Sequence, residues 1–82
     1  MSERETRNYV ASQELRRKFR VASLYAFTGG LAYFFWDDEE HGRHCVAFGG
    51  HDGLSSAELV ERVETEVAIY RLKGRVYEAK IN

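Results

Sequence analysis

The chain has 82 residues, of which 44% are hydrophobic and 30% are charged, and its net charge is −1. This composition is typical of a globular domain and excludes an intrinsically disordered chain. A single cysteine excludes an intrachain disulfide and is typical of a reducing compartment, and the charged start MSERETRN gives no sign of a signal peptide. No apolar run approaches the roughly 18 residues that a membrane span needs. We therefore expect one cytoplasmic domain, residues 1–82, that does not interact with membranes.

The charges are segregated along the chain. Residues 1–20 carry six basic and three acidic side chains, residues 37–66 carry nine acidic and two basic ones, and residues 71–82 carry four basic and one acidic. Two arrangements are compatible with this pattern. Either the basic ends pack beside the acidic middle and partly neutralise it, or the chain presents separate surfaces of opposite sign.

A helix is predicted over residues 2–19, because Ser2 and Glu5 have capping-box spacing ahead of an apolar residue every fourth position. One side of this helix is basic. A row of cations can bind a phosphate backbone, but nearby acids and the near-neutral charge of the domain favour a solvated helix face. The candidate nucleic-acid-binding residues are Arg16, Arg17, Lys18 and Arg20.

Three predicted strands follow, at residues 20–28, 31–36 and 44–48, and they suggest an antiparallel meander. Gly29 and Gly30 lie between two β-rich runs, which is the signal of a hairpin with a two-residue turn. Antiparallel pairing around this turn assigns the side chains to two faces. One face would carry Tyr25, Phe27, Ala32, Phe34 and Trp36, and the other Leu24, Ala26, Leu31, Tyr33 and Phe35.

Both predicted faces of this hairpin are apolar. A sheet that is wet on one side alternates apolar and polar residues instead. Either the chain covers both faces itself, or one face is an association surface for a second copy or for another protein. Buried aromatic side chains dominate interface energetics. The expected anchors are Leu24, Tyr33, Phe35 and Trp36.

The loop after the second predicted strand carries four consecutive acids: Asp37, Asp38, Glu39 and Glu40. A catalytic carboxylate pair needs environments that separate the two pKa values, and adjacent acids on a polar loop stay solvated. We therefore expect either an exposed acidic knob that meets a basic protein surface or a loop that only increases solubility. The outward side of the second predicted helix continues this acidic surface with Glu58 and Glu61.

Histidine and cysteine side chains are concentrated between residues 41 and 51. Imidazole and thiolate are preferred zinc ligands, but no C-x₂-C pair is present, and neighbours on a strand point to opposite faces. A site built from His41, His44 and His51 would form only if two loops converge, so we expect no metal and no cofactor. Cys45 lies in a strand and is expected to be a small buried apolar residue.

The second helix has the clearest local signal in the chain. Ser55 and Glu58 form a capping box, and an apolar stripe with steps of three and four residues follows. We predict a helix over residues 55–73 with a helical or extended tail over residues 74–82. A fourth and a fifth strand in place of the end of this helix are the alternative, because the β-branched content rises there.

These elements predict the α+β class: a single small domain with the order helix, three-stranded antiparallel meander, helix. Double-stranded-RNA-binding domains have a similar order, but they present basic residues near the start of the second helix, where this chain is acidic. We expect a non-enzymatic protein-binding module, such as a small adaptor, regulator or inhibitor, that acts through an aromatic sheet face and an acidic surface. That surface could block a nucleic-acid-binding site of its target. The alternative is a nucleic-acid-binding protein that uses the basic first helix.

Overall fold

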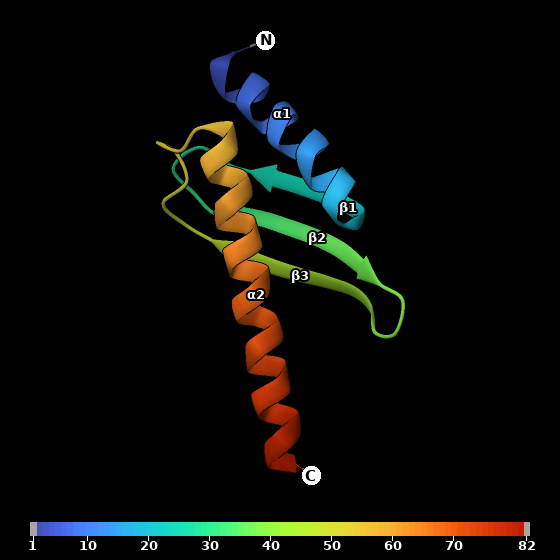
Figure 1. Ribbon diagram of the computed structural model, residues 1–82. Coiled ribbons are helices and arrows are strands. Elements are labelled where there is room, and N and C mark those ends of the chain that lie inside the picture. Colours follow the sequence, from blue (N-terminus) through green and yellow to red (C-terminus); the bar gives the residue numbers. More distant parts are fainter. Residues whose placement is uncertain (1, 82) are drawn as a thin grey trace.

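The computed structural model describes the backbone of residues 2–81 and the side chains of residues 2–74. Its elements are α1 (Glu3–Lys18), β1 (Arg20–Ala26), β2 (Ala32–Asp38), β3 (Gly42–Phe48) and α2 (Ser56–Ile81) (Figure 1). The strands form one antiparallel sheet with the order β1–β2–β3. The predicted α+β class and element order are therefore confirmed. No helix in the described part of the chain is long and apolar enough to span a membrane.

Side chains cap both helices at their first turns. The Ser2 hydroxyl accepts the backbone N–H of Glu5 at 3.1 Å. At the start of α2 the capping box is reciprocal: the Ser55 hydroxyl accepts the N–H of Glu58 at 3.2 Å, and the Glu58 carboxylate accepts the N–H of Ser55 at 3.0 Å. The capping box predicted for α2 is therefore confirmed, and its helix starts within one residue of the predicted position.

The capping box makes the stability of α2 sensitive to acid. The Ser55 backbone N–H, which donates to the Glu58 carboxylate, lowers the pKa of Glu58 below its ordinary value of 4.5. A carboxyl whose pKa is lower in the folded state stabilises the fold above its unfolded-state pKa, and this stabilisation disappears as the pH falls through the folded pKa. We expect Glu58→Gln to flatten the decline of the melting temperature below about pH 4.5. An unchanged slope in this variant would contradict the capping role.

The end of α2 differs from the alternative with extra strands. The helix continues to Ile81, so the predicted tail is helical. The alternative prediction of a fourth and a fifth strand is wrong. Gly74 lies inside the helix rather than at its end. A single glycine costs a helix only about 1 kcal/mol relative to alanine, and the residues before it, Arg71, Leu72 and Lys73, are good helix formers.

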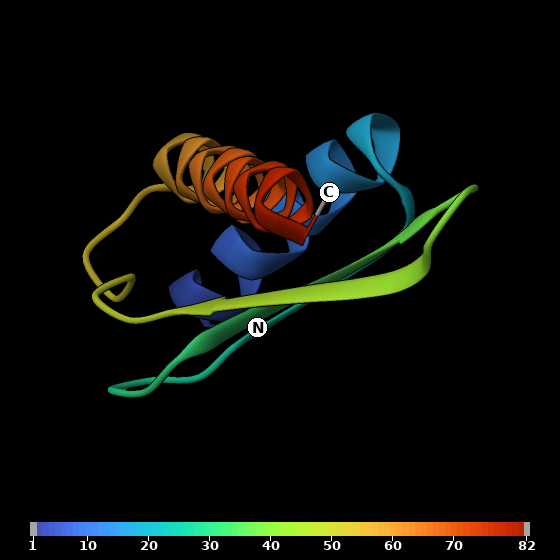
Figure 2. The same ribbon diagram turned by 90° about the horizontal axis from the view of Figure 1, so that it is seen from below.

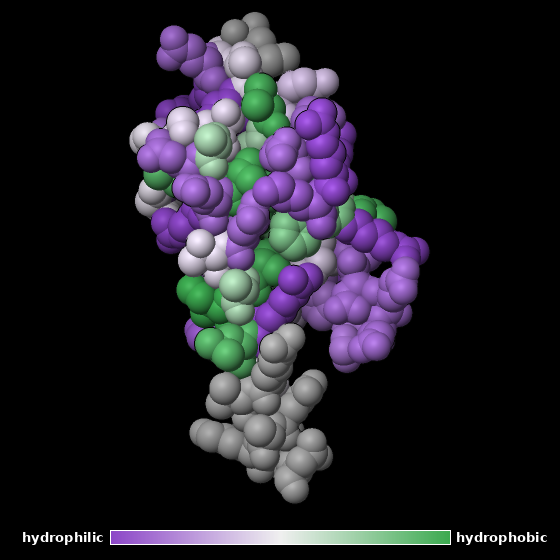
Figure 3. All heavy atoms as spheres, in the orientation of Figure 1, coloured by the Kyte–Doolittle hydropathy of each residue, from purple (hydrophilic) through white to green (hydrophobic). Residues whose placement is uncertain are grey.

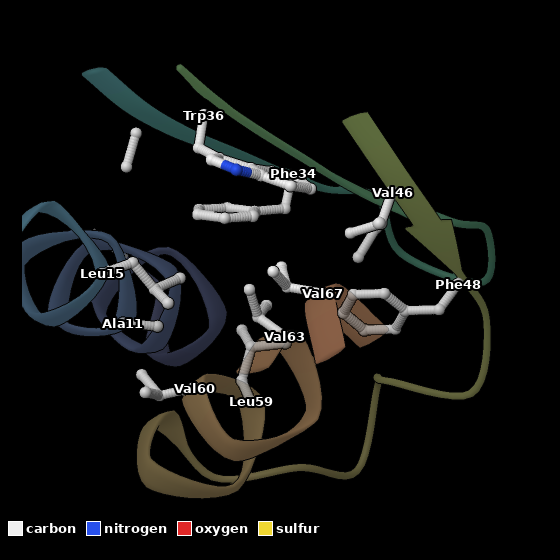
Figure 4. Packing of buried hydrophobic residues seen from close by; sticks show 12 residues of the cluster. Ala11, Leu15, Phe34, Trp36, Val46, Phe48, Leu59, Val60, Val63 and Val67 are labelled. Carbon is white, nitrogen blue, oxygen red and sulfur yellow. The ribbon is translucent and has the colours of Figure 1, made fainter. Parts of the chain in front are cut away.

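Both helices pack on the same side of the sheet, and no described element covers the other side (Figure 2). α1 packs against β1, and α2 packs against β3 and α1. The core between these layers contains alternate residues of β2 together with the apolar stripes of the helices (Figure 4). Its buried hydrophobic members are Ala11, Leu15, Ala22, Ala32, Phe34, Trp36, Val46, Phe48, Leu59, Val60, Val63 and Val67.

The first hairpin has a different register from the predicted one. Ala26 pairs with Ala32, and the loop between Phe27 and Leu31 therefore has three residues instead of two. Its backbone closes through the N–H of Phe27, which donates to the Leu31 carbonyl at 3.2 Å, and through Gly29, which has a φ of 68°. Because side chains alternate with a period of two, this one-residue difference moves the residues of β1 to the opposite faces. The predicted face assignment of β1 relative to β2 is wrong.

A β-bulge interrupts β1 near its start. Arg20 pairs with Asp37 and Ser23 with Phe35, so β1 contains one residue more than β2 between these pairs. Val21 lies in the bulge with a φ of 50° and an exposed side chain. This left-handed conformation is unusual for a β-branched residue.

We expect Val21→Gly to increase the free energy of unfolding by about 0.5–1 kcal/mol. The left-handed region costs an L-residue roughly 1–2 kcal/mol, part of which is offset by the backbone entropy of glycine. Thermal and urea unfolding measure this change. The matched control is Val21→Ala, which also removes the side chain but keeps the strained backbone, so the strain account is wrong if both variants have equal stability.

Arg7 holds the loop between β3 and α2 against α1. Its guanidinium donates to the carbonyl oxygens of His51 at 2.7 Å and Leu54 at 3.2 Å. The His51 ring is fully buried, and its Nε2 lies 2.9 Å from the carbonyl oxygen of Phe27. These contacts join the start of α1, the first hairpin and the loop before α2, and they account for a histidine in the core.

Candidate interaction surface

The uncovered side of the sheet carries four aromatic side chains: Tyr25, Phe27, Tyr33 and Phe35. We call these residues the open aromatic face. Tyr25 is 53% exposed and Phe27 is 56% exposed, whereas Tyr33 and Phe35 are partly covered by their neighbours. None of the four belongs to the core between the sheet and the helices. The prediction that the hairpin would be apolar on both faces is confirmed, and the two helices cover only one of them.

The rings of the open aromatic face are arranged in two diagonal pairs across β1 and β2. Tyr25 and Phe35 meet edge to face with their centroids 5.9 Å apart, and Phe27 and Tyr33 do so at 6.0 Å. Diagonal neighbours of this kind restrict each other's rotamers. The face is therefore an ordered apolar surface, which reduces the entropy cost of binding a partner.

Charged groups on this side of the sheet neutralise one another. Arg43 and Asp37 are cross-strand partners with 3.1 Å between Nη1 and Oδ1. The Arg43 guanidinium also lies over the Phe35 ring, 5.3 Å from its centroid. An ion pair therefore borders the open aromatic face, and the charges of Arg43 and Asp37 cancel each other.

Two of the four predicted anchors do not lie on this surface. Trp36 is 2% exposed and stacks on Phe34 in the core, with ring centroids 5.7 Å apart. Leu24 packs against the same core. Leu24 pairs with Phe34 across the strands, and Trp36 lies two residues after Phe34 on β2. Both side chains therefore point to the same side of the sheet as Phe34, toward the helices. We therefore exclude Leu24 and Trp36 from the surface and keep Tyr33 and Phe35.

The predicted acidic residues are separated in space. Glu39 and Glu40 are exposed in the loop between β2 and β3, a hydrophilic region in Figure 3, whereas Glu58 and Glu61 lie in the first turns of α2. These two sites lie at opposite ends of β3, whose seven residues span about 23 Å. Several of the acids also have partners inside the chain: Asp37 with Arg43, Asp38 with loop N–H groups, Glu39 with Arg20 and Glu58 with Ser55.

Three of the four candidate nucleic-acid-binding cations lie beside carboxylates of the same chain. Lys18 Nζ lies 2.7 Å from Glu64 Oε1, and Arg20 Nη1 lies 3.3 Å from Glu39 Oε1. Arg17 is paired with Glu14 at 3.4 Å within the helix, and Arg16 is exposed. The first two contacts join the basic start of the chain to its acidic middle, which is one of the two arrangements compatible with the charge pattern.

The structure brings two of the three histidines together. His41 and His44 lie at the end of the β2–β3 hairpin, with ring centroids 6.3 Å apart, and Asp38 lies beside both. His51 lies beyond the opposite end of β3 and cannot join them. The proximity of Asp38 was missed from the sequence. Trp36 pairs with His44, and Asp38 lies two residues after Trp36 on the same face of β2. The β2–β3 pairing therefore places Asp38 beside His44.

Cys45 is exposed, so the prediction of a buried cysteine is wrong. It pairs with Phe35 in the β2–β3 ladder and therefore lies on the uncovered side of the sheet. Its neighbour on the same side, Ala47, pairs with Tyr33 and is also exposed. These two small residues extend the open aromatic face onto β3.

A shallow depression of about 340 Å³ lies where α1 and α2 begin. Its charged lining consists of two acidic and two basic side chains: Glu3, Asp52, Arg4 and Arg7. Because Arg7 already donates to backbone carbonyls there, we identify no convergent set of reactive groups in this depression.

Comparisons with protein-family models, with curated proteins and with solved structures find no match to this chain.

Proposed function

We propose that this protein is a non-enzymatic protein-binding module, a small adaptor, regulator or inhibitor of the cytoplasm, and that the open aromatic face is its binding surface. A single observation carries the proposal: four aromatic side chains lie together on a sheet face that no described element covers. Contiguous apolar surface of this kind marks interaction sites on small proteins, and aromatic residues are enriched among interface hot spots.

The first partner that we assign to this face is a second copy of the chain. Two open aromatic faces that meet about a two-fold axis would stack two sheets about 10 Å apart, as in a β-sandwich. The face matches itself in chemistry, because it is apolar and its Arg43–Asp37 pair is internally neutral. A domain of 82 residues also buries only a modest core by itself, so burial between copies would add substantially to its stability.

Nucleic-acid binding is less well supported by the contacts. A phosphate backbone requires unpaired cations, and three of the four candidate cations lie beside carboxylates of the same chain. The aromatic residues that could stack on bases lie on the face opposite the helices, away from α1. This alternative predicts binding that decreases steeply with salt and is lost after nuclease treatment.

The experiment is a capture of partners on immobilised protein, with and without nuclease, using three baits. Wild-type bait should retain the same polypeptides with nuclease, and added free copies of the chain should be among them. Bait with Tyr33→Ser and Phe35→Ser should lose them. The matched control bait carries Tyr9→Ser and Val10→Ser, which change two exposed apolar residues of α1 and should retain the partners.

The outcomes separate the hypotheses cleanly. Retention that depends on Tyr33 and Phe35 and resists nuclease supports the proposal. Equal retention by the two double variants would show that the open aromatic face is not the binding surface. Retention that disappears with nuclease would replace the proposal with the nucleic-acid alternative.

A further inference from the structure

A second feature of the molecule, independent of the open aromatic face, is a cluster of three metal-ligating side chains: Asp38, His41 and His44. Asp38 ends β2, His44 lies in β3, and His41 lies in the loop between them. One ligand atom from each residue lies within 4.8 Å of the others. We propose that these three side chains bind one divalent transition-metal ion of the zinc type.

The ligand atoms lie close together, at separations somewhat longer than a tetrahedral ion requires. His41 Nδ1 lies 3.6 Å from Asp38 Oδ2, and His44 Nε2 lies 3.9 Å from the same oxygen. Zinc bonds of about 2.1 Å at tetrahedral angles place ligand atoms about 3.4 Å apart. The three ligand atoms lie within 4.8 Å of one another, so a bound ion would draw them closer together. His41 is an exposed loop side chain and can rotate toward the other two ligands.

The Asp38 carboxylate is already oriented for this role. Its Oδ1 accepts the backbone N–H groups of Glu40 at 2.7 Å and His41 at 3.4 Å. These bonds leave Oδ2 directed at the two imidazoles.

His44 provides the observation that points most directly to a ligand. Its Nδ1 lies 2.8 Å from the Tyr70 hydroxyl, and its ring stacks on Trp36 with centroids 5.3 Å apart. When Nδ1 donates its hydrogen to Tyr70, the lone pair of the neutral ring is on Nε2. That atom is buried and has no hydrogen-bond partner among the described residues, and it faces Asp38. Metal-bound histidines typically have this arrangement, with the second ring nitrogen held by an outer partner.

Two imidazoles and one carboxylate favour zinc over the hard cations. Mg²⁺ and Ca²⁺ prefer sets made entirely of oxygen, whereas imidazole nitrogen binds Zn²⁺, Co²⁺, Ni²⁺ and Cu²⁺ well. The three protein ligands leave a fourth position for water. Bound metal would fasten the β2–β3 loop to the end of the sheet beside α2.

The test is calorimetric titration of the full chain, without a histidine tag, with Zn²⁺ at pH 7.5. We expect one ion per chain, an increase in the melting temperature with Zn²⁺, and a visible Co²⁺ spectrum of a tetrahedral site. His41→Ala and Asp38→Asn should each weaken Zn²⁺ binding more than about 10-fold. Tyr70→Phe should weaken it by roughly 10-fold, because it removes only the partner that orients His44.

Two control variants decide whether the ion occupies this cluster. Glu40→Gln removes an adjacent exposed acid whose side chain is outside the cluster, and Cys45→Ser removes a possible thiolate ligand on the other face of β3. Both should bind Zn²⁺ as tightly as the wild type, and the Co²⁺ complex should lack a thiolate charge-transfer band. The proposal is overturned if wild-type protein shows no saturable binding, if His41→Ala binds unchanged, or if Cys45→Ser abolishes binding.

Discussion

Phe34→Ala is expected to lower the free energy of unfolding by about 3–5 kcal/mol, because it removes a fully buried ring from the centre of the core. A domain of this size has a total stability of only about 4–12 kcal/mol. The melting temperature should therefore fall by at least about 12 °C, and part of the population could be unfolded at 37 °C. Thermal and urea unfolding followed by circular dichroism provide the measurement.

The neighbouring residue supplies a matched control for this prediction. Phe35 is the same residue type one position further along β2, but it lies on the uncovered side of the sheet. Phe35→Ala should cost only about 1 kcal/mol in dilute solution, mainly from the lost edge-to-face contact with Tyr25. Equal destabilisation by the two variants, or a larger effect at Phe35, would mean that the assignment of β2 side chains to faces is incorrect.

The double variant Tyr33→Ser and Phe35→Ser should weaken self-association by about 4 kcal/mol, or roughly 1,000-fold in Kd. The estimate takes about 1 kcal/mol for each of the four substituted side chains that a two-fold dimer brings together, and one factor of ten in Kd per 1.4 kcal/mol. Sedimentation velocity over a wide range of protein concentration measures the association. The variant should remain a folded monomer at concentrations where the wild type is a dimer.

Changes to exposed apolar residues elsewhere should leave this association intact. Tyr9→Ser with Val10→Ser removes a similar amount of exposed apolar surface from α1, on the helical side of the molecule. This control should form dimers with the wild-type Kd. If it dissociates as readily as the double variant on the sheet, the association does not depend on the open aromatic face.

The local signals in the sequence were sufficient to predict the element order. Ser55 and Glu58 are a short-range motif whose bonds require no tertiary context, and the structure contains both of them. The alternation within β2 was equally local, so the division of Phe34 and Phe35 between two faces could be predicted. The sequence predicted that both faces are apolar, but it left open whether the chain itself covers both of them.

The pairing between strands could not be predicted in the same way. The Gly29–Gly30 pair suggested a two-residue turn, but the loop has three residues, and Val21 adds a bulge that no local signal marked. The error in register placed Tyr25 on the same face as Phe34. Both registers place apolar side chains on both faces of the hairpin, so the choice between them depends on packing against distant parts of the chain. The local sequence pattern does not describe that packing.

The candidate sites depended on the same long-range geometry. The four consecutive acids suggested one acidic surface, but their individual environments differ: Asp38 accepts bonds from its own loop, and Asp37 pairs across the strands with Arg43. His41 and His44 were recognised as potential ligands. The role of Asp38 beside them depends on the β2–β3 register, and that of Tyr70 depends on where α2 crosses the sheet.

The most direct test of the central proposal is the labelling rate of Cys45 as a function of protein concentration. Cys45 is the only cysteine of the chain, it is exposed, and it pairs with Phe35 beside the open aromatic face. If two copies bind through this face, the rate of modification by a thiol reagent should fall as the protein concentration rises, and it should stay constant in the Tyr33→Ser and Phe35→Ser variant. A wild-type rate that is independent of concentration would contradict the proposal that a second copy covers this surface.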